Sequence, residues 1–123
     1  MKVILLVASG RTGNEFFHSL LDSHSQILQF PGILKIDNEF INIINSKNAE
    51  EITKNFIKSF PHFFDSRLNK VERMNKLGKR KNKFFNVNKK KFSNNFANLM
   101  KKTKAKDGLD VVKNLHLAYS KAN

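Results

Sequence analysis

Residues 9–14, with the sequence Ser-Gly-Arg-Thr-Gly-Asn, have the types and spacing of an anion-binding loop. Gly10 and Gly13 let the backbone approach an oxyanion closely, and Arg11 between them adds a forked positive charge suited to phosphate or sulfate. The loop matches neither the G-x-x-x-x-G-K-[ST] pattern of triphosphate-binding loops nor the dinucleotide pattern G-x-G-x-x-G. Loop chemistry alone therefore leaves two alternatives, an anion site and a tight turn that binds nothing.

An anion site of this kind needs a strand before the loop and a helix after it, and the sequence predicts both. Residues 3–8 form an unbroken apolar run rich in β-branched side chains, which is typical of a strand buried on both faces of a parallel sheet. Apolar residues then recur at helical spacing after the loop: Phe16, Phe17, Leu20 and Leu21. A helix that begins here directs its free N–H groups and the positive end of its dipole at the loop. Residues 1–33 are thus predicted to form a strand-loop-helix element whose loop could bind an anion.

This stretch resembles the start of the sulfotransferase family. In that family a strand runs into a loop of the type basic-Ser/Thr-Gly-Thr/Ser-Thr/Ser, which binds the 5′-phosphosulfate end of 3′-phosphoadenosine 5′-phosphosulfate (PAPS). Here Arg11-Thr12-Gly13 follows Ser9-Gly10. The next helix in the family often ends in a leucine pair followed by His-Pro-x-Ile, and residues 20–27, Leu-Leu-Asp-Ser-His-Ser-Gln-Ile, match this except at Ser25. The match covers about the first quarter of the chain and fades after Gly32.

The resemblance implies an α/β fold with a P-loop-like sulfotransferase core, of which this chain is an N-terminal portion with one clear strand and mostly helices. It implies an enzyme that moves a sulfuryl group from PAPS to a hydroxyl or amine acceptor without a metal. Carried over residue by residue, it implies that the donor is bound by Ser9, Gly10, Arg11, Thr12, Gly13 and Asn14. Arg11 is the implied catalytic residue, since it would neutralise charge on the transferring and leaving groups.

Two residues depart from the family pattern. Asn14 and Glu15 stand where the family usually has two hydroxyl residues. Asn14 can still cap the helix and donate an amide hydrogen, whereas Glu15 would repel a bound phosphate unless its side chain points away.

Beyond the loop the sequence predicts mainly helices. Four are indicated by caps and helical spacing. The first is capped by Asp37 and carries residues 40–44, and the second is opened by a capping box of Asn48 and Glu51 and ended by Pro61. The third covers Lys89–Lys102, and the fourth is capped by Asp110 after a break at residues 104–108. Pro31-Gly32 is a turn signal, and residues 76–88 read mostly as loop.

This imbalance between one strand and four or five helices leads to an expectation about the whole chain. A buried strand needs neighbours because its N–H and C=O groups must be paired, and no segment after Ala8 predicts a second strand of comparable quality. We therefore expect residues 1–123 to be a single, incomplete domain. The resemblance to sulfotransferases implies that a strand with an arginine and a serine for the cofactor's 3′-phosphate would follow. The alternative is a small helical protein with an unrecognised edge hairpin.

The charge distribution supports a different functional hypothesis. Residues 1–66 contain six basic and seven acidic residues, a net charge of −1, whereas residues 67–123 contain seventeen and three, a net charge of +14. A lysine-rich segment at residues 67–106 is typical of binding to nucleic acid or an anionic membrane, with stacking platforms available among Phe84, Phe85, Phe92 and Phe96. The alternative function is therefore a nucleic-acid-binding module whose loop is non-functional. A solvated lysine surface is the simpler interpretation, because clustered arginine is absent and Phe92 and Phe96 have the spacing of a core face.

Other chemistries find little support. The chain has no cysteine, which excludes disulfides and thiolate metal sites and suggests a cytoplasmic protein. No apolar segment approaches the ~20 residues of a membrane span. His18 and His24 lie six residues apart and so on different helix faces, which argues against a joint metal site. Sulfuryl transfer needs a general base that takes a proton from the acceptor hydroxyl, and His62 and His116 are candidates for it along with the other two histidines. The acidic pairs Glu50-Glu51 and Asp107/Asp110 are predicted to be helix N-terminal charges. A kinase-like phosphate-binding protein is disfavoured because no Lys-Ser/Thr pair follows the second glycine.

Overall fold

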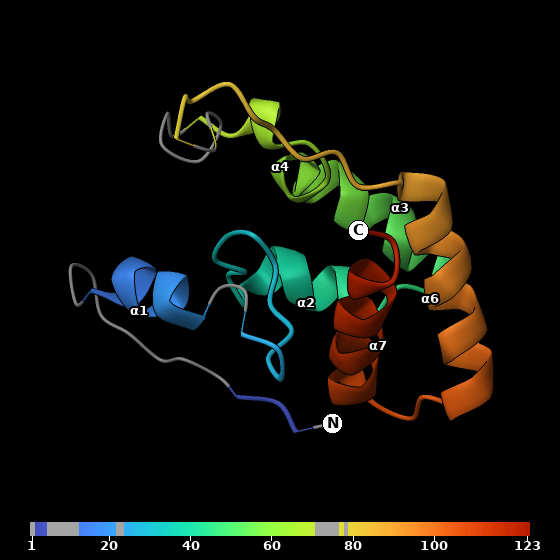
Figure 1. The fold of residues 1–123 in the computed structure, drawn as a ribbon. Coiled ribbons are helices and arrows are strands. Elements are labelled where there is room, and N and C mark those ends of the chain that lie inside the picture. The colour runs from blue at the N-terminus through green and yellow to red at the C-terminus, as the bar shows by residue number, and fades with distance from the viewer. Residues whose placement is uncertain (1, 5–12, 22–23, 71–76, 78) are drawn as a thin grey trace.

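The computed structural model describes residues 2–4, 13–21, 24–70, 77 and 79–123, and in this part the protein is helical (Figure 1). The helices are α1 (Asn14–Leu21), α2 (Asn38–Ile44), α3 (Ala49–Ser59), α4 (Pro61–Phe64), the 3-10 helix η1 (Ser66–Leu68), α6 (Lys89–Thr103) and α7 (Gly108–Ser120). Helix α6 packs against α7 and α3, and α2 packs against α3 and α7. We call residues 37–70 and 79–123 the helical body, and residues 13–21, which lie apart from it in Figure 1, the N-terminal arm.

The predicted α/β fold with a P-loop-like sulfotransferase core is wrong for the part of the chain that the structure describes. That part contains no sheet, only two isolated antiparallel bridges, Asp65–Asn86 and Leu77–Lys83. Of the predicted strand at residues 3–8, Val3 and Ile4 are described, adopt no strand conformation and are 41% and 80% exposed; residues 5–8 lie outside the described residues. An apolar run favours a strand locally, but a strand needs a neighbour to pair its backbone groups, and the other described segments have helical spacing and helix caps instead.

The capping residues explain where the helices of the body begin. Asp37 Oδ1 accepts the Phe40 N–H at 3.0 Å, which confirms the predicted start of α2. Asn48 Oδ1 accepts the Glu51 N–H at 2.9 Å, and the Glu51 carboxylate accepts the Lys47 N–H at 3.1 Å. These reciprocal bonds make the capping box that the sequence predicts for α3, with the return bond one residue earlier than usual.

Helix α7 begins earlier than the sequence predicts. Its cap is Asp107, whose carboxylate accepts the Asp110 N–H at 2.9 Å, and the predicted cap Asp110 lies in the first helical turn. The prediction failed because Gly108 was assigned to the preceding break, although here it is the first residue of the helix. Glycine at position 108 is favoured by packing, because a Cβ there would lie 3.1 Å from Ile44 Cδ1 of α2.

Phenylalanine rings fill the core of the helical body. Phe56 of α3 is fully buried, and its ring lies beside those of Phe30, Phe60, Phe63, Phe64 and Phe92. The Tyr119 ring of α7 packs against the same cluster of rings, and its hydroxyl donates a hydrogen bond to the carbonyl of Phe63. Burial raises the pKa of the Tyr119 hydroxyl well above its ordinary value, so that this hydroxyl remains a donor at neutral pH.

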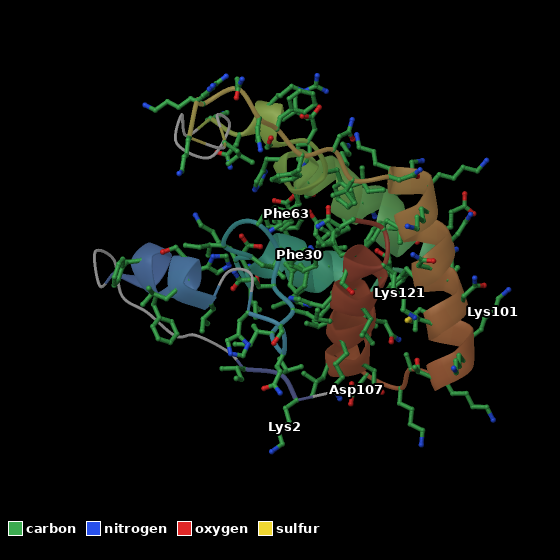
Figure 2. All side chains as sticks on the ribbon, in the orientation of Figure 1. Lys2, Phe30, Phe63, Lys101, Asp107 and Lys121 are labelled. Carbon is green, nitrogen blue, oxygen red and sulfur yellow. The ribbon has the colours of Figure 1, made fainter. Side chains whose placement is uncertain are left out.

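Phe30 connects the segment after the N-terminal arm to this core. Its ring stacks on Phe63 with centroids 5.1 Å apart and lies 4.2 Å from the ring of His116, and Figure 2 shows Phe30 and Phe63 together in the interior. The turn at Pro31-Gly32 follows directly, as predicted, and a Cβ on Gly32 would lie 3.0 Å from Phe63 Cε1. Glycine at this turn therefore allows the chain to pass closely over the core.

Candidate functional site

The structure describes only the end of the predicted donor-binding loop. Ser9, Gly10, Arg11 and Thr12 lie outside the described residues, whereas Gly13 and the backbone of Asn14 lie within them. Gly13 adopts a left-handed conformation with φ of 78°, and, its two chain neighbours aside, no atom of the described residues lies within 4 Å of the position that a Cβ would occupy. Glycine is therefore favoured here by backbone conformation rather than by crowding.

Helix α1 begins immediately after Gly13. The Gly13 carbonyl accepts the Phe17 N–H at 2.9 Å, which is the first bond of the helix. The N–H groups of the first turn have no partners within an α-helix, and they carry the positive end of its dipole. The helix start directly after Gly13 is thus present, as the sequence predicts, and the backbone donors of its first turn are suited to bind an anion.

The N-terminal arm exposes most of its apolar side chains. Phe16 is 69% exposed and Leu20 is 61% exposed. One hydrogen bond joins α1 to the segment that leads to the core, from the Gln29 side-chain amide to the His18 carbonyl at 3.2 Å. The apolar spacing that correctly predicted a helix therefore does not mark a face buried by the rest of the described chain.

The structure does not bring the four histidines together. His18 lies on α1, and His24 Nδ1 accepts the Gln26 N–H at 3.2 Å in an exposed turn. His116 Nδ1 lies 2.9 Å from the Val112 carbonyl within α7, and burial lowers the pKa of the His116 imidazole. Burial also lowers the pKa of His62, whose ring is 4.6 Å from Phe63. No group of three potential metal ligands occurs among the residues that the structure describes.

The acidic pairs serve the helix starts, as the sequence predicts. Glu50 and Glu51 lie in the first turn of α3, and Asp107 and Asp110 lie at the start of α7. Asp110 accepts the Lys106 N–H at 3.2 Å and pairs with the Lys113 amine at 3.3 Å. The Lys106 N–H and the Lys113 amine hold the pKa of Asp110 below its ordinary value. Glu51, Asp107 and Asp110 thus accept backbone N–H groups at helix starts, which agrees with the prediction of helix N-terminal charges.

The basic half of the chain, residues 67–123, carries positive charge on its surface. All the lysine and arginine side chains between residues 79 and 106 are exposed, and Figure 2 shows Lys101 extending outward from α6. Phe92 and Phe96 are fully buried, which confirms that their spacing marks a core face. Phe85 packs against the core from its edge, whereas Phe84 is 54% exposed. Of the four phenylalanines considered as stacking platforms, Phe84 is the one that presents its ring to solvent.

A clustered arrangement around Phe84 was missed by sequence reasoning. The Arg67 guanidinium lies over the Phe84 ring, 4.5 Å from its centroid. Asp65 holds that guanidinium through two short contacts, Nε to Oδ1 at 2.9 Å and Nη2 to Oδ2 at 2.6 Å. The Arg67 side chain lowers the pKa of Asp65. The only sequence signal was the Asp-x-Arg spacing, because the contact with Phe84 spans two segments that are distant along the chain.

Comparisons with protein-family models, curated proteins and solved structures gave no significant match to this chain. No helix of the described residues is long and apolar enough to cross a membrane.

Proposed function

We propose that residues 9–14 bind the 5′-phosphosulfate end of PAPS and that this chain carries the donor-binding element of a sulfotransferase. The observation that supports this most directly is the turn at Gly13, where a left-handed glycine leads straight into α1. In the sequence this turn ends the series Ser-Gly-Arg-Thr-Gly, which resembles the cofactor loop of that family. The open space beside Gly13 leaves room for a phosphate close to the backbone.

Backbone amides and the Arg11 side chain would bind different parts of the donor. The backbone amides of Thr12, Gly13 and Asn14 would hold the 5′-phosphate at the start of α1, where the helix dipole favours negative charge. Arg11 would contact the transferring group with its forked guanidinium. The fit of the described part is good, since Gly13 has no side chain to obstruct an oxyanion.

The bound donor supplies an activated sulfuryl group. Arg11 would neutralise the charge that builds up on the phosphate oxygen as the acceptor oxygen bonds to sulfur and the sulfur–oxygen bond to that phosphate breaks. The loop amides would keep the attacking and leaving oxygens in line, so that positioning and charge stabilisation provide most of the acceleration. The proton of the acceptor hydroxyl or amine would pass to a general base, a role that a histidine or a glutamate can fill at neutral pH.

Calorimetric binding of 3′-phosphoadenosine 5′-phosphate tests the proposal. Arg11→Ala removes a charge-assisted contact of about 1.5–3 kcal/mol and should weaken binding about tenfold or more. Arg80→Ala, which removes the same charge from an exposed site in the basic half, serves as the matched control and should change affinity little. Absence of binding by folded wild-type protein, or equal affinities for all three proteins, would overturn the proposal.

Glu15 provides a second test with the opposite sign. Glu15→Thr deletes a negative charge next to the loop and restores a hydroxyl residue typical of the family, so that nucleotide affinity should rise. The change should cost a few tenths of a kcal/mol in helix stability, because an acidic residue in the first turn favours the helix dipole. An unchanged affinity would mean that residue 15 does not face the bound phosphate.

A further inference from the structure

The segment of residues 79–91 forms a basic ridge along one edge of the molecule. It runs from the loop after Leu77 to the start of α6, and Figure 1 shows it as the yellow to orange trace above α4 and α3. The seven basic residues of the ridge are all exposed, and no acidic residue lies among them: Lys79, Arg80, Lys81, Lys83, Lys89, Lys90 and Lys91. The basic ridge is therefore strongly positive along its own sequence, and the carboxylate of Asp65, which is bridged to Asn86 and pairs with Arg67, lies beside it.

The backbone of the ridge is fixed to the core. The Phe85 N–H donates to Ser66 Oγ at 3.1 Å, and the Phe85 carbonyl accepts the Ser66 N–H at 3.2 Å. The Val87 N–H donates to the Phe64 carbonyl at 2.7 Å, and the Val87 side chain is buried. These contacts hold Phe84 in place, so its outward ring is pre-organised rather than free to collapse on the surface.

Phe84 is supported from one side. Arg67 lies over the ring at 4.5 Å, and the bidentate contact with Asp65 keeps the guanidinium there. The ring nevertheless remains 54% exposed, in the middle of the basic ridge. A fixed aromatic ring flanked by cations is the combination that proteins use to bind single-stranded nucleic acid, with stacking for bases and positive charge for phosphates.

The three lysines at the start of α6 point to the same kind of ligand. Lys89, Lys90 and Lys91 occupy the first turn, which contains no acidic residue. Cations are unfavourable at this end of a helix because the dipole is positive there. The first turns of α2, α3 and α7 each contain an acidic residue. Phosphate groups bound along the ridge would offset this repulsion in α6.

We propose that the basic ridge, together with Arg67 and Phe84, binds single-stranded nucleic acid. The lysines of the ridge contact successive phosphates, and one base stacks on the exposed part of the Phe84 ring. Anionic lipid headgroups would engage the lysines but offer no planar base to stack on the Phe84 ring. The ridge does not include the donor loop, so this proposal stands independently of the sulfotransferase activity.

Fluorescence anisotropy with a labelled oligouridine of about 15 nucleotides tests the electrostatic part. The ridge variant combines Lys79→Gln, Arg80→Gln and Lys81→Gln; the control combines Lys101→Gln, Lys102→Gln and Lys104→Gln, which removes the same charge at the other end of α6. Loss of three phosphate contacts should reduce the slope of log K against log salt by about two and weaken binding at least tenfold at about 100 mM salt. The control should bind nearly as wild type. Equal losses in both variants, or no binding by wild type, would overturn the proposal.

Phe84 variants test the stacking part. Phe84→Leu should weaken binding about fivefold or more, whereas Phe84→Tyr, which keeps the ring, should bind as wild type. Far-UV circular dichroism reports whether each variant is folded, and in Phe84→Leu, where Tyr119 is still the single tyrosine, its fluorescence reports it as well. Unchanged oligouridine affinity in Phe84→Leu would overturn the proposal. So would tighter binding to vesicles with about one-third anionic lipid than to the oligonucleotide, which would favour a membrane surface instead.

Discussion

The N-terminal arm and the helical body follow the same local rules but differ in what they bury. Both have apolar residues at helical spacing, and both form the predicted helices. In the body, Phe56 is fully buried among other rings, whereas in the arm Phe16 is 69% exposed. The difference shows that helical spacing predicts a helix, while burial depends on which other elements meet its apolar face.

The starts of the helices differ in the same way. In the body a side chain caps each of the four longer helices: Asp37, Asn48, Asn88 and Asp107 accept backbone N–H groups of α2, α3, α6 and α7. In the arm the residue before α1 is Gly13, which has no side chain to cap the helix. Gly13 therefore cannot occupy the first N–H groups of α1 with a capping side chain, which is compatible with an anion bound there.

The largest expected effect is on the core, and it contrasts two phenylalanines. Phe56→Ala should lower the free energy of unfolding of the body by about 3–5 kcal/mol, because it leaves a cavity at the centre of the core. Phe16→Ala removes an identical ring that is already exposed, and it should change the free energy of unfolding of the body by less than about 0.5 kcal/mol. Urea denaturation followed by the fluorescence of Tyr119 measures both, since the chain has no tryptophan and no other tyrosine. A similar loss in the two variants would contradict the separation of arm from body.

A smaller effect is expected at the cap of α7. Asp107→Ala should cost about 1 kcal/mol, because the Asp110 N–H loses its acceptor and the start of α7 loses a favourable charge. Asn98→Ala, at an exposed position within α6, is the control and should be neutral or slightly stabilising through helix propensity. Thermal denaturation by circular dichroism compares them. Equal stability of the two variants would place the helix start elsewhere.

Local signals in the sequence were sufficient to predict most of the body. The caps at Asp37 and Asn48, the turn at Pro31-Gly32 and the core spacing of Phe92 and Phe96 all act within a few residues of the chain. Each can therefore be recognised without knowing the tertiary structure.

Features that depend on distant contacts were not predicted. The apolar run at residues 3–8 suggested a sheet, but strand pairing is decided by a partner elsewhere in the chain, and the described residues provide none. The stack of Arg67 on Phe84 likewise joins two segments that are distant along the chain and are held together by hydrogen bonds such as those between Ser66 and Phe85. For the donor loop, the sequence correctly predicted the helix after Gly13, and binding itself stays a prediction.

A pH-dependent effect is expected at His116, where segment 24–36 meets the body. Burial lowers the pKa of the His116 imidazole below its ordinary value of 6.5, so the unfolded chain binds a proton more readily than the folded one. The stabilisation is therefore complete above about pH 6.5 and declines as the pH falls from there toward the lower pKa of the folded state.

Urea denaturation at a series of pH values measures this dependence in wild type and in His116→Leu, which keeps the bulk beside Phe30 but cannot titrate. The variant should show a flatter profile across this window. Burial also lowers the pKa of His62, so a residual slope of the same sign should remain. Parallel profiles for wild type and variant would mean that His116 does not contribute to the pH dependence.

The smallest effect on the stability of the body is expected from Gly13→Ala, although this substitution should destabilise the start of α1. Gly13 has φ of 78°, and an alanine there is strained by about 1–2 kcal/mol, which should destabilise the start of α1. Among the described residues, chain neighbours aside, no atom lies within 4 Å of the added methyl group, so we expect the strain to stay local to the start of α1. Hydrogen exchange should therefore show faster exchange of the α1 amides, while the urea midpoint reported by Tyr119 stays unchanged. Gly32→Ala is the informative contrast, because its methyl group would lie 3.0 Å from Phe63 and should lower the midpoint. A midpoint that falls equally in both variants would show that the arm and the body unfold as one cooperative unit.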